Sequence, residues 1–145
     1  MDELEAKLRG AVEQLLGDGE RLEGVCVATQ VGLFKGRMVV LAATDRRLLA
    51  QGMTRRFEPD GAPVSIAPEE LESASVEGAG GGWADLGAAV MDHAAVTLKL
   101  RTAAGEKLKL MLMRGTGPLG RLGGGETQRS GVEAVGRFFE RAAAS

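Results

Sequence analysis

Four basic side chains on two adjacent predicted strands are the strongest chemical signal in the sequence. Lys99 and Arg101 lie on one strand, and Lys107 and Lys109 lie on the next. Like charges directly opposite one another destabilise a sheet, so a neighbouring acid such as Glu72, salt or an anionic partner must offset them. The alternative, and the more common origin of such a pattern, is a solvated outer face that prevents pairing with other chains.

Two further features could contact a partner. Lys35 and Arg37 flank a glycine beside Phe34, and a basic loop with an exposed aromatic could touch an anionic membrane surface. Trp83, the only tryptophan, follows three glycines and could anchor a partner protein. For both aromatics, packing against the domain's own core is the favoured alternative.

Residue types that carry catalysis do not form a set. His93 is the only histidine, so no metal-ligand cluster is expected, and no nucleophile accompanies an Asp92–His93 pair. Cys26 lies between two valines and is expected to be a small buried hydrophobic residue. The G-x-G-x-x-G match at Gly115–Gly120 lacks the βαβ unit that a dinucleotide site requires. We therefore predict no catalytic residue, no cofactor and no metal, and hence not an enzyme.

Length and composition indicate one folded domain. The chain has 145 residues, of which 44% are hydrophobic and 26% charged, which excludes a disordered or a membrane protein. The longest apolar run, Met38 to Ala43, is too short to span a bilayer. The acidic N-terminus does not resemble a signal peptide, and a single cysteine agrees with a reducing compartment. We expect a cytoplasmic location.

Charge argues against nucleic acid as a partner. The net charge is −2, and the four Phe and one Trp do not alternate with cations on a strand as RNA-binding sheets require. All 18 basic residues lie outside the stretch between Arg56 and Lys99, which contains eight acids. The folded protein is therefore expected to have a basic side and an acidic side.

The hydrophobic period predicts a helix, seven short strands and a second helix. Apolar residues at helical spacing predict a helix over residues 2–16, within an N-terminal extension of residues 1–17. Ser130 and Glu133 form a capping box that predicts a final helix over residues 131–143. Residues 78–93 and 114–128 are predicted glycine-rich loops. A period of two predicts strands at residues 22–30, 37–43, 47–53, 64–66, 71–77, 95–102 and 106–113.

The last two predicted strands form the best-determined hairpin. A three-residue loop ending in Gly105 supplies the left-handed position that such loops need. This loop sets a register in which Leu100 faces Leu108 and Leu98 faces Leu110, with all of them directed at the core. The same register places Lys99 opposite Lys109 and Arg101 opposite Lys107.

Three stretches give the chain its family resemblance. They are Gly19-Glu20, the run Leu33–Val40 that leads into the turn Thr44–Leu49, and the hairpin Val96–Leu112 followed by a helix. Together they resemble a bacterial pleckstrin-homology-like domain over about residues 18–143. The resemblance implies a mainly β fold, a seven-stranded bent sandwich or partly open barrel closed by a C-terminal α-helix. Residues 18–145 are taken as that domain.

The resemblance also suggests what the domain does. Pleckstrin-homology folds bind phosphoinositides, peptides or proteins, and the fold alone does not choose among them. In lipid-binding members, cations in and beside the first hairpin loop hold the phosphates. This chain offers only Lys35 and Arg37 there, with Arg46 or Arg47 as a third, and a structural role is favoured for both of these arginines.

Three functions remain open from the sequence. The first is a non-catalytic binding or adaptor domain that recognises a protein partner, or a second copy of itself, through one face of the sandwich. The second is peripheral attachment to anionic lipid head groups through Lys35 and Arg37, with the patch from Lys99 to Lys109 as a possible addition. The third is an enzyme or small-ligand protein, which would need a deep polar cavity near His93 or Asp92. We expect the first.

Overall fold

The computed structural model describes residues 3–31, 37–54, 56, 58–77, 83, 86, 96–112 and 126–144. Within them lie all seven predicted strands, two α-helices and one short 3-10 turn. The helices are α1 (Glu3–Glu13) and α3 (Glu126–Ala144), and the 3-10 turn is η1 (Pro68–Glu70). The strands are β1 (Leu22–Gln30), β2 (Arg37–Thr44), β3 (Leu48–Gly52), β4 (Val64–Ile66), β5 (Leu71–Glu77), β6 (Val96–Thr102) and β7 (Lys107–Leu112).

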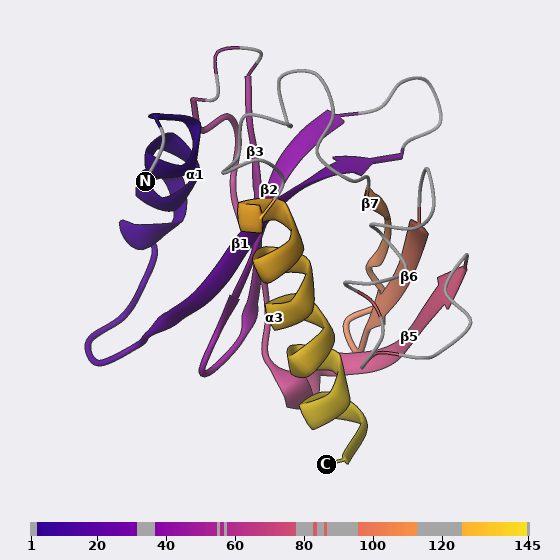
Figure 1. Ribbon diagram of the computed structural model, residues 1–145. Coiled ribbons are helices and arrows are strands. Elements are labelled where there is room, and N and C mark those ends of the chain that lie inside the picture. The colour runs from indigo at the N-terminus through magenta and orange to yellow at the C-terminus, as the bar shows by residue number, and fades with distance from the viewer. Residues whose placement is uncertain are drawn as a thin grey trace.

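The strands form a single antiparallel sheet that bends around α3. Their order is β4-β3-β2-β1-β7-β6-β5, so the first four strands form one half and the last three the other (Figure 1). α3 lies against the first half, and its Phe138 and Phe139 are fully buried. These rings pack with inward residues from both halves, among them Leu41 on β2 and Leu98 on β6. The main core therefore fills the space between the two halves of the sheet.

α3 begins earlier than the sequence predicts. The expected start at residue 131, with Ser130 as the cap, is wrong, because the helix runs from Glu126 and Ser130 lies inside it. Its first turn is held by the buried Gln128, whose amide donates to the Val27 carbonyl and accepts from the Val27 N–H, each at 2.9 Å. These bonds satisfy backbone groups on β1 just before its pairing with β7 begins at Ala28.

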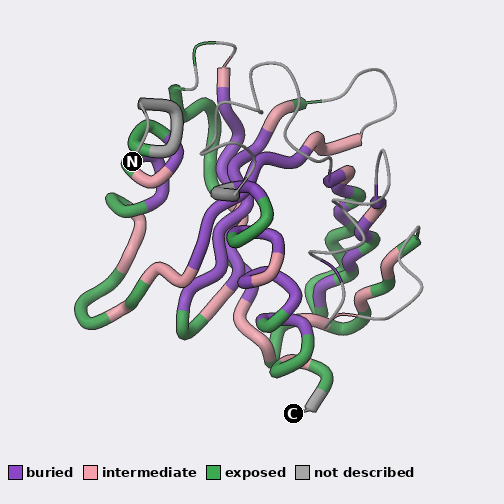
Figure 2. The backbone as a smooth tube through the Cα atoms, in the orientation of Figure 1, coloured by how far each residue is buried: buried purple, intermediate pink, exposed green. Residues whose placement is uncertain are grey.

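α1 makes a second, smaller core on the other side of the sheet. The helix ends at Glu13, slightly before the predicted residue 16. Its buried Leu8 and Val12 pack on the outer face of β1–β3, where Val40 and Leu49 are also buried. The first half of the sheet is thus covered on both faces, by α3 on one and by α1 on the other. Figure 2 shows the continuous burial along these central strands.

A buried ion pair fixes the turn between β2 and β3. The Glu20 carboxylate accepts from Nε and Nη2 of Arg47, each at 2.9 Å, and from the Thr44 hydroxyl at 2.7 Å. Arg47 also donates to the Leu15 carbonyl at 2.8 Å, which joins this turn to the chain leaving α1. The hydrogen bonds from Arg47 hold the pKa of Glu20 at about 2, although burial opposes the shift. The structural role predicted for Arg47 is confirmed.

Candidate anion-binding face

The β6–β7 hairpin has the register that the sequence predicts. Leu100 pairs with Leu108 and Leu98 with Leu110, and all four side chains are buried. Gly105 has a φ of +94°, the left-handed conformation expected at the loop. Because side chains alternate along a strand, the intervening residues must point to the outer face.

Those outer residues form two parallel rows. Lys99 on β6 lies opposite Lys109 on β7, and Arg101 lies opposite Lys107. β5 extends each row, because Ser75 pairs with Lys99 and Ser73 pairs with Arg101. Each row therefore reads hydroxyl, cation, cation across the three strands. All six side chains are exposed, and we call this set the basic face: Ser73, Ser75, Lys99, Arg101, Lys107 and Lys109.

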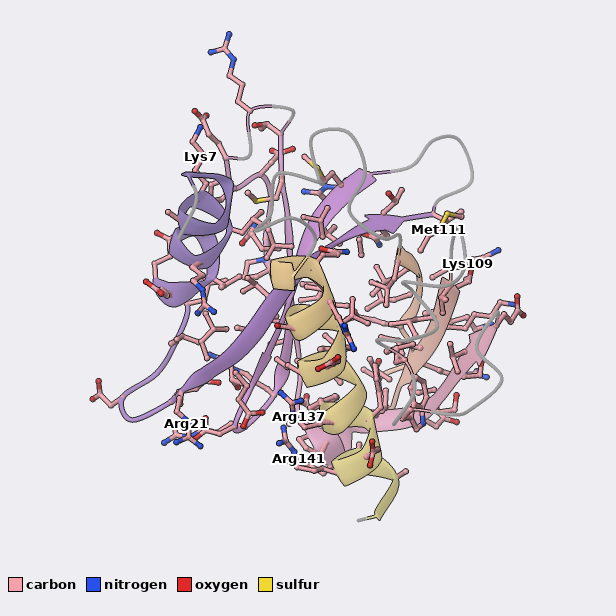
Figure 3. The ribbon with its side chains drawn as sticks, viewed as in Figure 1. Lys7, Arg21, Lys109, Met111, Arg137 and Arg141 are labelled. Carbon is pink, nitrogen blue, oxygen red and sulfur yellow. The ribbon has the colours of Figure 1, made fainter. Side chains whose placement is uncertain are left out.

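The basic face is hollowed rather than flat. A shallow open hollow of about 410 Å³ lies among its six side chains. Val31, which follows β1, and the hairpin residues Leu100 and Leu108 complete the lining. In Figure 3, Lys109 and the neighbouring Met111 lie on the side of the molecule away from α1. The hollow therefore extends across both rows.

Two acids partly balance the four cations. Glu77 on β5 accepts from the Lys99 ammonium at 2.6 Å, and Glu72 lies 3.7 Å from the Arg101 guanidinium. The hydrogen bond and charge of Lys99 lower the pKa of Glu77, and the charge of Lys109 adds to this. Side chains of both acids are more than half exposed, and ion pairs between exposed groups contribute little.

The lysines of β7 are the less balanced pair. Among the described residues, neither Lys107 nor Lys109 has an acid within ion-pair distance. Yet each stands directly opposite another cation. Lys107 and Lys109 therefore carry positive charge that no described acid pairs with at ion-pair distance, although Lys109 acts on Glu77 from farther away. Such charge on an exposed surface favours an anion.

Arg37 does not join the basic face. It begins β2, which β1 separates from β7 in the sheet. Its guanidinium donates to the Asp60 carbonyl and lies 3.9 Å from the Asp60 carboxylate. The same group lies over the backbone of Gly52 and Gly61, where any side chain would collide with it. Phe34 and Lys35 fall outside the described residues.

The other candidate residues have no part in this face. The Trp83 ring stacks on Phe139 with centroids 4.5 Å apart and is only partly exposed, as the packing alternative predicted. Cys26 is fully buried, and burial raises the pKa of its thiol to about 12. Asp92, His93 and the glycine motif at residues 115–120 lie outside the described residues.

The described residues contain neither a metal-ligand cluster nor a membrane-spanning helix. Nowhere in that part of the chain do three potential metal ligands of the His, Cys, Asp or Glu types come together. No helix there is long and apolar enough to cross a membrane.

Sequence reasoning missed the two serines. It identified the four cations, but it treated residues 71–77 only as a weaker strand. Alternating small hydroxyls at positions 73 and 75 were the available signal, since alternate residues of a strand share a face. Their place beside Lys99 and Arg101 depends on pairing between β5 and β6, across the long connection of residues 78–95.

The class of fold follows from the geometry. Seven antiparallel strands in one bent sheet, closed by a C-terminal helix, make a pleckstrin-homology-like fold, as the resemblance implied. The fold alone does not assign a function, which has to be argued from the site.

Comparison with solved structures gives the individual likenesses. The hSac2 domain from human phosphoinositide phosphatase Sac2 is similar with a TM-score of 0.52 at 12% identity, over 93% of this chain and 75% of that one. A pleckstrin homology domain from Shewanella amazonensis is similar with a TM-score of 0.45 at 23% identity, over 84% of this chain and 96% of that one. A DUF1696 family protein with a pleckstrin-homology domain from Shewanella loihica has a TM-score of 0.44 at 16% identity, over 85% of this chain and 92% of that one. At such identities a likeness concerns the fold alone.

No protein-family model and no curated protein matches the sequence.

Proposed function

We propose that this protein is a non-catalytic binding domain that recognises an acidic segment of a protein partner through the basic face. The supporting observation is the pairing of Lys99 with Lys109 and of Arg101 with Lys107 on an exposed surface. Like charges held opposite each other disfavour the hairpin, and an anionic ligand would relieve that repulsion. In the described part of the chain, α1 covers the outer face of β1–β3, so that face is not open to a partner in the same way.

The details of Arg37 make membrane attachment the weaker alternative. In the form that relies on the first hairpin loop, this hypothesis needs the loop cations to reach lipid phosphates. Arg37 instead uses its guanidinium on Asp60, within the same molecule. A lipid would have to compete with this contact, whereas Lys107 and Lys109 have no such acid among the described residues.

Binding of a simple acidic polypeptide tests the proposal. Labelled poly-L-glutamate and vesicles containing an anionic phospholipid are titrated with wild type and with a Lys107→Glu/Lys109→Glu variant. Lys7→Glu/Arg21→Glu is the matched control, because it changes the net charge equally at exposed sites on the opposite side of the view in Figure 3. We expect poly-L-glutamate affinity to fall about tenfold or more in the first variant only, at about 0.7 kcal/mol for each reversed lysine.

Three results would contradict the proposal. An equal loss in both variants would mean that only the net charge matters. Binding to vesicles but not to poly-L-glutamate would favour peripheral membrane attachment. Absence of binding to either probe would remove the basic face as the working surface. Sedimentation velocity on the same samples identifies the case in which the partner is a second copy, since self-association would then disappear with Lys107 and Lys109.

A further inference from the structure

We infer that the acidic segment binds in an extended conformation, with two acidic side chains at alternate positions, i and i+2, one above each row of the basic face. This inference rests on the proposed function and specifies the ligand. Its basis is the duplicated hydroxyl, cation, cation pattern that pairing of β5, β6 and β7 creates.

The spacing of the rows suits an extended peptide. Two residues along a strand rise about 6.8 Å, and this is the separation of the Lys99 row from the Arg101 row. Directly opposite residues within a row are about 5 Å apart, so one carboxylate can lie between Lys99 and Lys109 and another between Arg101 and Lys107. An extended ligand also has a rise of about 6.8 Å between alternate side chains, which project from one side.

The net charge of the basic face indicates how many acidic groups the ligand carries. The basic face and its flanking acids comprise four cations and two carboxylates, Glu72 and Glu77. Two positive charges therefore remain, which two ligand carboxylates would balance. Ser75 and Ser73 add one hydroxyl donor to each row, on the β5 side of the cations.

A single compact anion would use the face differently. One phosphate group is smaller than the separation of the rows, so it would depend on one row and leave the other unused. A ligand with two acids depends on both rows. Lys109 belongs to the first row and Lys107 to the second, so neutralising each of them in turn distinguishes these cases.

Isomeric peptides provide the test. Two labelled heptapeptides of identical composition carry two glutamates each, at i and i+2 in one and at i and i+3 in the other. Seven residues are too few for a stable helix, so in extended chains the second pair lies about 10 Å apart on opposite sides. We measure their affinities by fluorescence anisotropy with wild type, Lys107→Gln, Lys109→Gln and the Lys7→Glu/Arg21→Glu control.

The expected result is a fivefold or greater preference for the i, i+2 peptide. Each glutamine substitution should lower the affinity for that peptide by a similar factor, and the Lys7→Glu/Arg21→Glu control should not change the preference between the two peptides. Equal affinities for the two peptides, or dependence on only one of the two lysines, would overturn the inference. Either outcome is separable from failure of the proposed function, because poly-L-glutamate would still bind to wild type and not to the Lys107→Glu/Lys109→Glu variant.

Discussion

Replacing Gly131 with alanine should separate α3 from β1. Gly131 lies inside α3, and a Cβ there would overlap the backbone carbonyl of Val25 on β1. The obstacle is backbone held in a sheet, so it cannot rotate away as a side chain could. Relief requires the helix to move, and this would strain the two hydrogen bonds between Gln128 and Val27.

The expected effect has two opposing terms. Alanine favours the helix by about 1 kcal/mol relative to glycine. Overpacking costs about 1–3 kcal/mol, and weakening two buried hydrogen bonds adds about 1 kcal/mol for each bond. We expect Gly131→Ala to lower the free energy of unfolding by about 2–4 kcal/mol, which lowers the melting temperature by roughly 8–16 °C for a chain of this size.

Gly10→Ala is the matched control for this experiment. Gly10 is exposed in α1, and a Cβ there would have no atom within 4 Å. Only the higher helix propensity of alanine then acts, so the free energy of unfolding of this variant should rise by roughly 0.5–1 kcal/mol. Thermal and urea unfolding followed by circular dichroism measure both variants. If Gly131→Ala proved as stable as wild type, close contact between α3 and β1 would not be what Gly131 provides.

Two further predictions concern buried polar groups. Because Arg47 lowers the pKa of Glu20 from 4.5 to about 2, the carboxylate stabilises the fold fully above pH 4.5 and loses this effect as the pH falls toward 2. Glu20→Gln should therefore lower the free energy of unfolding by about 2 kcal/mol at neutral pH. Urea titrations between pH 4.5 and 2 should show a smaller loss of stability with falling pH than in wild type, and an unchanged pH dependence would contradict the role given to Glu20. Gln128→Leu should cost about 2–4 kcal/mol, because it leaves the N–H and carbonyl of Val27 buried without their partner, and unchanged urea midpoints would show that these bonds contribute little.

Local patterns in the sequence predicted the strands and the hairpin well. The register of β6 and β7 depends on strict alternation and on one left-handed glycine, and both are visible within residues 96–112. The turn at Thr44 was predictable for the same reason, since its hydroxyl accepts from the N–H groups of Arg46 and Arg47 close by in the chain.

Features that depend on distant segments were not predictable. The capping box of Ser130 and Glu133 predicted a helix that starts at residue 131, whereas Gly131 lies inside α3 and lets it approach Val25, more than a hundred residues earlier. Arg47 was expected to be structural, but its partner Glu20 precedes it by a whole hairpin. Such residues are brought together by the bending of the sheet, which local patterns in one sequence do not predict.

The unequal covering of the sheet separates folding from recognition. β1–β3 carry buried residues on both faces, so most substitutions there disturb one of the two cores. On β6 and β7 every second side chain is exposed or partly exposed and contributes little to either core. If the proposed function holds, ligand preference can therefore be altered at Lys99, Arg101, Lys107 and Lys109 while the scaffold stays intact.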